Sequence, residues 1–453
     1  MAANRPAHRT NERRTAVESD AATELISRER AFGARNYDPL PVVLARGEGS
    51  HVYDVDGRRY LDLMSAYSAV SFGHAHPKIV GALIGQAQKL GVTSRAYFND
   101  KLPLLFERLA ELTGLDRVLP SNGGAEAVET AIKASRKWGY KIKGIADGRA
   151  EIIACQNNFH GRTIAITGLS SEPQYRDGFG PFPAGLLTIP YGDADALARA
   201  ITPNTAAFLV EPVQGEGGMI VPPPGYLARC AQLCREHHVL LICDEIQTGL
   251  GRIGRFLGCE YDGVVPDGVI LGKALGGGLL PVSAFIGTND VMQVFQPNDH
   301  GNTFGGNPLA AAVAMAALDV LFEEKLIQRS ADVGAWLLAD LQDLRGSVVT
   351  EAQEAQHVIG RVVGVDPGVA LRPGVLGPQR ATAAIDGVHV VHQPLDSGGE
   401  AILSELVPVD AAFLGPFCPL AEWPMALSGL TPILEILSAA RIIFRSCPLG
   451  LRI

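Results

Sequence analysis

Val239-Leu-Leu-Ile-Cys-Asp244 and Gly268-Val-Ile-Leu-Gly-Lys273 are the two runs that decide the expected fold. Each is a short aliphatic run, which is typical of a buried strand in a parallel sheet. The first run ends in an acid and the second in an amine. Ligands of open α/β sheets bind outside the carboxyl ends of the strands, so we expect Asp244 and Lys273 to meet at one edge of one sheet.

The chemistry of this pair favours a cofactor that carries an aldehyde and a pyridine ring. A partly desolvated amine has a lowered pKa and acts as a nucleophile. A pyridine nitrogen stays protonated beside an anion, which makes the ring an electron sink. Taken singly, Lys273 also suits a surface loop, and Asp244 suits a helix cap or a solvated turn. Together the two residues are far more specific, and they predict pyridoxal 5'-phosphate.

A candidate phosphate site opens the next helical pattern. Ser121-Asn-Gly-Gly124-Ala125 precedes a helix expected to end at Trp138. The N–H groups and the dipole of a helix N-terminus attract an anion, and glycine permits close approach. A plain N-cap by the serine or the asparagine would explain the same residues. A second polar, Gly-rich turn offers the hydroxyl of Thr303 to a phosphate.

Asn158-Phe159-His160-Gly-Arg162 follows the strand candidate Glu151–Cys155. An aromatic side chain at a strand end can stack on a flat ring, as Phe159 would. Arg162 offers a bidentate fork for a substrate carboxylate. A core phenylalanine and a surface arginine are the alternative interpretations of these two residues.

Two further motifs suggest rival chemistries. Gly249-Leu-Gly251-Arg-Ile-Gly254 is a literal G-x-G-x-x-G, but five residues separate it from the strand and no amphipathic helix follows, which disfavours a dinucleotide site. Gly73-His74-Ala-His76 could suggest a metal, yet no other ligands gather in sequence. We therefore expect a turn before a helix there, and no metal.

The composition limits the classes of function. The chain has 453 residues, of which 47% are hydrophobic and 19% charged, as in a globular protein. The net charge of -9, with no dense basic run beyond the first residues, disfavours a nucleic-acid partner. No apolar run approaches the ~18 residues that a membrane span needs. Seven scattered cysteines without CxxC spacing predict reduced thiols in a cytoplasmic protein.

Strand-like runs alternate with helical patterns, which predicts an α/β fold with a mostly parallel sheet covered by helices. Residues 1–20 contain four arginines but no apolar block, so they are not a secretory signal. We expect a tail there, and a transit peptide is the alternative. Further strand candidates are Arg117–Leu119 and Ala206–Val210; the helix candidates are Lys78–Leu90, Ala125–Trp138, Gly225–His237, Pro308–Glu324 and Met425–Ile443.

The residues resemble the class III (ω-amino) pyridoxal-phosphate aminotransferases, and within them the enzymes that act on ornithine. The resemblance extends from Ala34 to Val349. The runs that carry it are Asn36-Tyr-Asp-Pro-Leu-Pro, Ser65-Ala-Tyr-Ser-Ala-Val, Gly73-His-Ala-His-Pro-Lys, Thr93-Ser-Arg-Ala, Arg136-Lys-Trp-Gly-Tyr, Asp177-Gly-Phe-Gly-Pro-Phe, Glu211-Pro-Val-Gln-Gly-Glu, Asp244-Glu-Ile-Gln-Thr-Gly and Leu271-Gly-Lys-Ala-Leu.

The resemblance implies a fold-type I subunit whose large domain, over residues 66–325, holds a mostly parallel seven-stranded sheet. A smaller α/β domain would combine residues 21–65 with residues 326–453. The family also implies a homodimer or a higher homo-oligomer. Its cofactor would be held covalently by Lys273, at the ring nitrogen by Asp244, at the ring hydroxyl by Gln247, under the ring by Phe159, and at the phosphate by Gly124, Ala125 and, across the subunit interface, Thr303.

Substrate residues follow from the same resemblance. Tyr37 and Arg162 match positions that hold the α-amino acid end of ornithine, and Tyr67 matches a tyrosine that favours ornithine over simpler ω-amines. Glu216 matches an acidic gate that pairs with a C-terminal arginine. Two positions depart from the pattern of close ornithine enzymes: His160 replaces a tryptophan and Asn302 replaces a serine.

Residues 351–453 do not align with the family's C-terminal pattern, and Arg445-Ser-Cys-Pro-Leu is a faint echo of its arginine segment. The activity implied is transfer of the δ-amino group of L-ornithine to 2-oxoglutarate, which gives glutamate 5-semialdehyde and glutamate. The alternatives are another ω-aminotransferase, acting on acetylornithine or 4-aminobutyrate, and an inactive homologue with an aberrant C-terminus.

Overall fold

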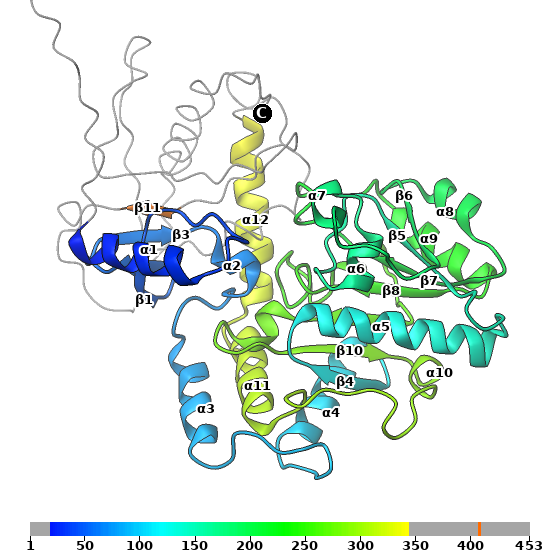
Figure 1. Ribbon diagram of the computed structural model, residues 1–453, viewed down its shortest axis with the longest axis horizontal. Coiled ribbons are helices and arrows are strands. Elements are labelled where there is room, and N and C mark those ends of the chain that lie inside the picture. Colours follow the sequence, from blue (N-terminus) through cyan, green and yellow to red (C-terminus); the bar gives the residue numbers. More distant parts are fainter. Residues whose placement is uncertain (1–18, 344–405, 409–453) are drawn as a thin grey trace, which may run out of the picture.

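The computed structural model describes residues 19–343 and 406–408. Its larger part is built on a seven-stranded sheet (Figure 1). β10 is antiparallel to both of its neighbours, β4 and β9, and all the other pairs are parallel, which confirms the mostly parallel sheet that the sequence predicts. In spatial order the strands are β4 (Arg117–Ser121), β10 (Ser283–Gly287), β9 (Gly268–Leu271), β8 (Leu240–Asp244), β7 (Thr205–Val210), β5 (Glu151–Cys155) and β6 (Leu186–Ile189).

Both faces of the sheet are buried because successive side chains of each strand point to opposite sides. Phe208 and Val210 of β7 join one core, whereas Ala207 and Leu209 join the other. A fully buried side chain such as Phe208 contributes roughly 1.5–3 kcal/mol of apolar stabilisation. Helices α4 (Leu102–Thr113), α9 (Tyr226–Glu236) and α11 (Pro308–Glu323) cover the first face; α5 (Gly124–Trp138), α6 (Ile164–Leu169) and α10 (Asn289–Met292) cover the second.

The predicted elements of this part are largely right. Glu151–Cys155 and Gly268–Leu271 have the predicted bounds, and the four helix candidates before Leu326 agree to within a turn. β6 and β10 were not predicted: β6 is a half-exposed edge strand, and β10 starts after a Gly-rich stretch. The remaining short elements are α7 (Pro173–Arg176), α8 (Ala194–Ala200), the π-helix η1 (Gly139–Lys143), and the 3₁₀-helices η2 (Gly258–Asp262) and η3 (Lys273–Gly276).

A second, smaller sheet lies apart from the first, with α12 (Leu326–Asp343) between them (Figure 1). It is antiparallel and has the order β1-β2-β3-β11. Its strands are β1 (Leu44–Glu48), β2 (His51–Asp54), β3 (Arg59–Asp62) and β11 (Leu406–Pro408), and α1 (Asp20–Phe32), α2 (Ser65–Ser68) and α3 (Pro77–Ala87) complete the described helices.

Few predictions for the two ends of the chain fall on described residues. The first helix begins at Asp20, the last residue of the expected tail, with the side chain of Ser19 accepting a hydrogen bond from Ala22. The predicted helix Met425–Ile443 and the segment around Arg445 lie outside the described residues. In the part of the chain that the structure describes, no helix is both long and apolar enough to cross a membrane.

Candidate active site

Asp244 and Lys273 lie at the same edge of the large sheet. Asp244 is the last residue of β8, Lys273 follows the carboxyl end of the neighbouring parallel strand β9, and Asp244 is paired in register with Ile270 of β9. Asp244 is 3% exposed, and Lys273 is half-buried with a left-handed backbone (φ 44°), a strained conformation that is common at functional sites. The sequence therefore placed these two residues correctly relative to each other.

The start of α5 lies at the same edge. The side chain of Ile246 fills the space beside Gly124 and Gly272, where added Cβ atoms would come within 2.9 and 3.3 Å of it. Two glycines thus let α5, β8 and the segment before Lys273 pack closely together.

The backbone N–H groups at the start of α5 fall into two sets: two are bound by a capping side chain, and the next two have no acceptor within the helix. Glu126 accepts hydrogen bonds from the N–H groups of Asn122 and Gly123, at 2.8 and 3.0 Å. Capping by Ser121 or Asn122, the alternative weighed from sequence, is wrong, because no side chain of either caps the helix. The N–H groups of Gly124 and Ala125 lie in the first helical turn, where no intrahelical acceptor exists, so they could bind a phosphate.

Thr303 lies beside this turn but is exposed. The neighbouring Asn302 accepts a hydrogen bond from the side chain of Asn122 at 3.1 Å, which joins the two Gly-rich turns. The asparagine that replaces the family's usual serine therefore has a structural contact of its own.

His160 is the residue that contacts Asp244 most directly. Its Nδ1 lies 2.7 Å from Asp244 Oδ2, and its side chain is fully buried. Burial acts to lower the pKa of His160, but the hydrogen bond to Asp244 and the charges of Asp244 and Glu211 raise it above its ordinary value. The loop that carries His160 also presses on α5, because a Cβ at Gly161 would lie 2.9 Å from the Cβ of Ala125.

Glu211 is a site residue to which the sequence analysis gave no role. It directly follows β7, is 6% exposed, and accepts a hydrogen bond from the backbone N–H of Phe159 at 3.1 Å. Burial and the charge of Asp244 raise its pKa to about 7, against the opposing effects of His160, the Phe159 N–H and Lys273. The signal that could have identified it is an acid directly after a buried strand, β7, which pairs with the strand that ends in Asp244.

Phe159 and Arg162 pack with Tyr175 near this edge of the sheet. The ring centroids of Phe159 and Tyr175 are 6.3 Å apart, and the guanidinium carbon of Arg162 is 3.9 Å from the centre of the Tyr175 ring. Arg162 is exposed, so its fork can turn toward a carboxylate in solution.

Gln247, Glu216 and Tyr67 come together although they are far apart in sequence. The Gln247 amide donates to the Glu216 carboxylate at 3.2 Å and to the Tyr67 carbonyl at 3.4 Å. This arrangement requires glycine at position 215, where a Cβ would lie 1.6 Å from the Gln247 side-chain oxygen. Tyr37 lies before β1 and is 67% exposed.

Tyr67 belongs to a left-handed turn. Residues 65–68 all have positive φ, between 45° and 78°, although none is glycine. Such a backbone costs roughly 1–2 kcal/mol per residue. Asp62 offsets part of this cost by accepting hydrogen bonds from the N–H groups of Met64 and Ser65, while its other oxygen binds His74 at 2.7 Å.

The rival motifs have structural explanations. Gly251 and Gly254 pack against Ile327 and Ala331 of α12, where Cβ atoms would meet neighbours at 3.0 Å. His76 binds Glu324 at 3.0 Å and precedes α3, as the predicted turn requires.

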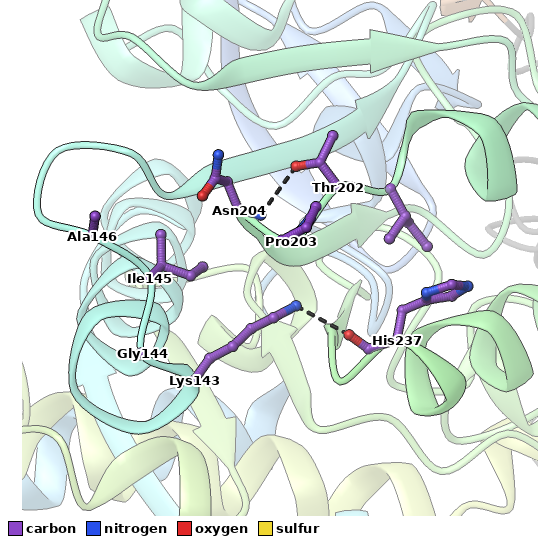
Figure 2. Close-up of a pocket in the computed structure, with 9 residues that line it drawn as sticks. Lys143, Gly144, Ile145, Ala146, Thr202, Pro203, Asn204 and His237 are labelled. Carbon is purple, nitrogen blue, oxygen red and sulfur yellow. Dashed lines mark hydrogen bonds between the residues drawn. The ribbon is translucent and has the colours of Figure 1, made fainter.

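A cavity of about 590 Å³ lies at the opposite edge of the sheet, near the starts of β5, β7 and β8 (Figure 2). Its lysine, Lys143, donates to the carbonyls of Thr205 and His237 at 2.7 and 3.1 Å. A cavity at the amino ends of the strands is not where open α/β sheets bind cofactors, so the candidate active site remains at the Asp244 edge.

Comparison with known proteins decides the family. The family Aminotransferase class-III matches residues 32–366. The chain belongs to the class-III aminotransferases. The aminotransferase is 51% identical over 350 residues to the ornithine aminotransferase of Bacillus subtilis (strain 168), which covers 77% of this chain and 86% of that relative.

Solved structures agree with this assignment. An ornithine aminotransferase from Toxoplasma gondii, crystallised with oxidised glutathione and described as having partial occupancy of PLP at its active site, is 46% identical with a TM-score of 0.71 and covers 72% of this chain and 77% of that one. An acetylornithine aminotransferase from Elizabethkingia anophelis is 48% identical with a TM-score of 0.64, covering 71% and 79%. The fold is therefore that of a fold-type I transaminase, and its cofactor is pyridoxal 5'-phosphate.

The site fits this cofactor. A buried carboxylate, a lysine and a helix N-terminus with open amides lie at one edge of one sheet, which are the groups that a pyridine nitrogen, an aldehyde and a phosphate require.

Proposed function

We propose that this aminotransferase transfers the δ-amino group of L-ornithine to 2-oxoglutarate, giving glutamate 5-semialdehyde and glutamate. The observation that carries the proposal is the meeting of Tyr67 and Glu216 around Gln247, at the edge that holds Asp244 and Lys273. The resemblance assigns to Tyr67 a preference for ornithine over simpler ω-amines and to Glu216 the role of an acidic gate.

In the proposed mechanism, the cofactor supplies a ring that withdraws electrons from the reacting carbon. The carboxylate of Asp244 would accept a hydrogen bond from the protonated ring nitrogen, and the burial of Asp244 would strengthen that interaction. The amides of Gly124 and Ala125 would hold the phosphate, and Phe159 would lie against the ring. Lys273 would hold the cofactor through its side-chain amine, and as a free amine it would carry a proton to and from the reacting carbon as general base and acid.

We propose that groups of opposite charge, a guanidinium and a carboxylate, orient the substrate. By the resemblance, Arg162 and Tyr37 would bind the α-amino acid end of ornithine, while Gln247 would bind the ring hydroxyl. By the resemblance, Glu216 is an acidic gate: its negative charge repels a second carboxylate, and pairing with an arginine would cancel that charge, which suits an enzyme that must admit a diamino acid in one half-reaction and a dicarboxylate in the other.

Acetylornithine is the main alternative donor, because the acetylornithine aminotransferase of E. anophelis is about as identical in sequence to this chain as the ornithine aminotransferases are. The test is kcat/KM of the purified chain with ornithine, acetylornithine and 4-aminobutyrate, each with 2-oxoglutarate. The proposal expects ornithine to be the best donor by at least about tenfold, a margin of about 1.4 kcal/mol. Equal or better use of acetylornithine would assign the other substrate, and no semialdehyde from any donor would indicate an inactive homologue.

We also propose that the enzyme is a cytoplasmic homodimer. Five described cysteines are free and buried, as in a reducing compartment.

The dimer is proposed from an exposed apolar surface. Tyr97 and Phe98 are 71% and 93% exposed, and Phe304 is 55% exposed. The two segments are joined because the side chain of Asn99 donates to the Gly306 carbonyl. This apolar surface beside Thr303 suits a second copy. Light scattering should give twice the subunit mass, and Phe98→Asp should lower it; a monomeric wild type would contradict the proposal.

A further inference from the structure

Asp62 and His74 form a charge-assisted contact beside the left-handed turn that carries Tyr67. Asp62, the last residue of β3, is 7% exposed, and its Oδ2 lies 2.7 Å from His74 Nε2. Burial acts to raise the pKa of Asp62, but the hydrogen bonds from His74, Ser65 and Met64 together lower it below its ordinary value. The carboxyl is therefore ionised and can only accept hydrogen bonds, so His74 is the donor at Nε2.

The smaller sheet fixes His74 in place. The backbone N–H of His74 donates to the Gly49 carbonyl at 2.7 Å, and the Gly49 N–H donates back to the His74 carbonyl at 3.0 Å. The imidazole lies against Gly47 of β1, where an added Cβ would come within 2.6 Å of the ring. Both the backbone and the ring of His74 are thus held by the segment that joins β1 to β2.

The second oxygen of Asp62 holds the start of the turn. Oδ1 accepts hydrogen bonds from the N–H groups of Met64 and Ser65, at 3.1 and 2.8 Å. Tyr67 follows in a run of four left-handed residues, and its carbonyl accepts a hydrogen bond from Gln247 at 3.4 Å. A run of strained residues keeps its shape only where its surroundings hold it, so the position of Tyr67 depends on this carboxylate.

We propose that Asp62 and His74 are positioning residues for Tyr67, and that through it they set the preference for ornithine over simpler ω-amines. This inference rests on the proposed function, in which Tyr67 contributes to ornithine recognition. The bond to His74 fixes the rotation of the Asp62 carboxylate and thereby the start of the turn. The end of the turn is held separately, because the Ser71 hydroxyl donates to the Ser68 carbonyl at 2.8 Å. Loss of the His74 bond should therefore shift Tyr67 without unfolding the turn.

The experiment compares two amides at position 74 of the holoenzyme. In His74→Gln the amide nitrogen reaches the position of Nε2 and can donate to Asp62, whereas in His74→Asn it lies near the position of Nδ1 and is too short to reach. His76→Asn is the matched control, since His76 belongs to the same motif but binds Glu324 at 3.0 Å. The readouts are the ratio of kcat/KM for ornithine to that for 4-aminobutyrate, and the hydrogen-exchange rate of peptides that span the turn.

We expect His74→Asn to lower the ratio about fivefold or more and to speed exchange in the turn about tenfold. His74→Gln should recover most of both, and His76→Asn should match wild type. Exchange in peptides from β7 should be the same in every variant, which verifies that the fold is intact. Equal ratios or equal exchange in His74→Asn and His74→Gln would overturn the inference, whether both resemble wild type or both are impaired. An effect of the same size in His76→Asn would overturn it as well.

A failure of the proposed function gives a different result. If wild type does not prefer ornithine to 4-aminobutyrate, the proposed substrate is wrong, while hydrogen exchange in the turn still decides whether Asp62 and His74 position Tyr67. If wild type prefers ornithine and both amides keep its ratio, the substrate stands and the inference fails.

Discussion

Replacing Glu211 by glutamine should change how the stability of the protein depends on pH. Burial raises the pKa of Glu211 to about 7, whereas in the unfolded chain it returns to the ordinary value of 4.5. The folded state therefore holds the proton more tightly than the unfolded state. The stabilisation from this proton is fully present below pH 4.5 and is lost as the pH rises toward and through about 7.

The size of the effect follows from the two pKa values. At about 1.4 kcal/mol per pKa unit, the interval corresponds to about 3 kcal/mol. Glutamine keeps an oxygen that accepts the Phe159 N–H but has no proton to lose. Relative to wild type, Glu211→Gln should thus gain about 2 to 3 kcal/mol between pH 5 and pH 8.

Urea denaturation of the cofactor-free protein at these two pH values, at constant ionic strength, measures the difference. Glu236→Gln, at an exposed glutamate of α9, is the control for adding a glutamine at all. A stability difference between wild type and Glu211→Gln that stays the same at pH 5 and pH 8 would refute the argument that this carboxyl is buried next to Asp244.

Three further substitutions test other parts of the account. Gly215→Ala should displace the Gln247 side chain, which a Cβ would approach to 1.6 Å, and lower kcat/KM for ornithine by at least about tenfold without unfolding the protein. Tyr67→Ile should reduce the preference for ornithine over 4-aminobutyrate, measured as the ratio of the two kcat/KM values. Phe208→Ala, at a fully buried side chain of β7, should cost about 3–5 kcal/mol in urea denaturation; a loss below about 1 kcal/mol would contradict the described core.

The central strands and the pair at their ends could be predicted from sequence because the pattern there is local and strong. A continuous aliphatic run that stops at Asp244 or shortly before Lys273 identifies the strand, its burial and its functional end together. β6 could not be recognised in the same way, since an edge strand with exposed leucine and threonine has no apolar pattern that distinguishes it from a loop.

The contacts that organise the site depend on tertiary structure instead. Glu126, rather than Ser121 or Asn122, caps α5, and sequence spacing fits both arrangements equally well. The pairing of His160 with Asp244 joins residues that are 84 apart, and the grouping of Tyr67 with Gln247 joins residues that are 180 apart. The sheet order, with β7 between β5 and β8, brings the residues after these three strands to one edge, and the chain around α2 returns to that edge.

The most direct test of the account is the position at which the cofactor becomes attached. The purified protein is mixed with pyridoxal phosphate, reduced with borohydride, digested, and mapped by mass spectrometry, with Lys273→Ala and Lys143→Ala treated in parallel. We expect the pyridoxyl group on Lys273, no visible absorption band in Lys273→Ala, and an unchanged band in Lys143→Ala. Stoichiometric labelling of another lysine, or a full band in Lys273→Ala, would contradict the claim that the amine at position 273 and the acid at position 244 hold one cofactor between them.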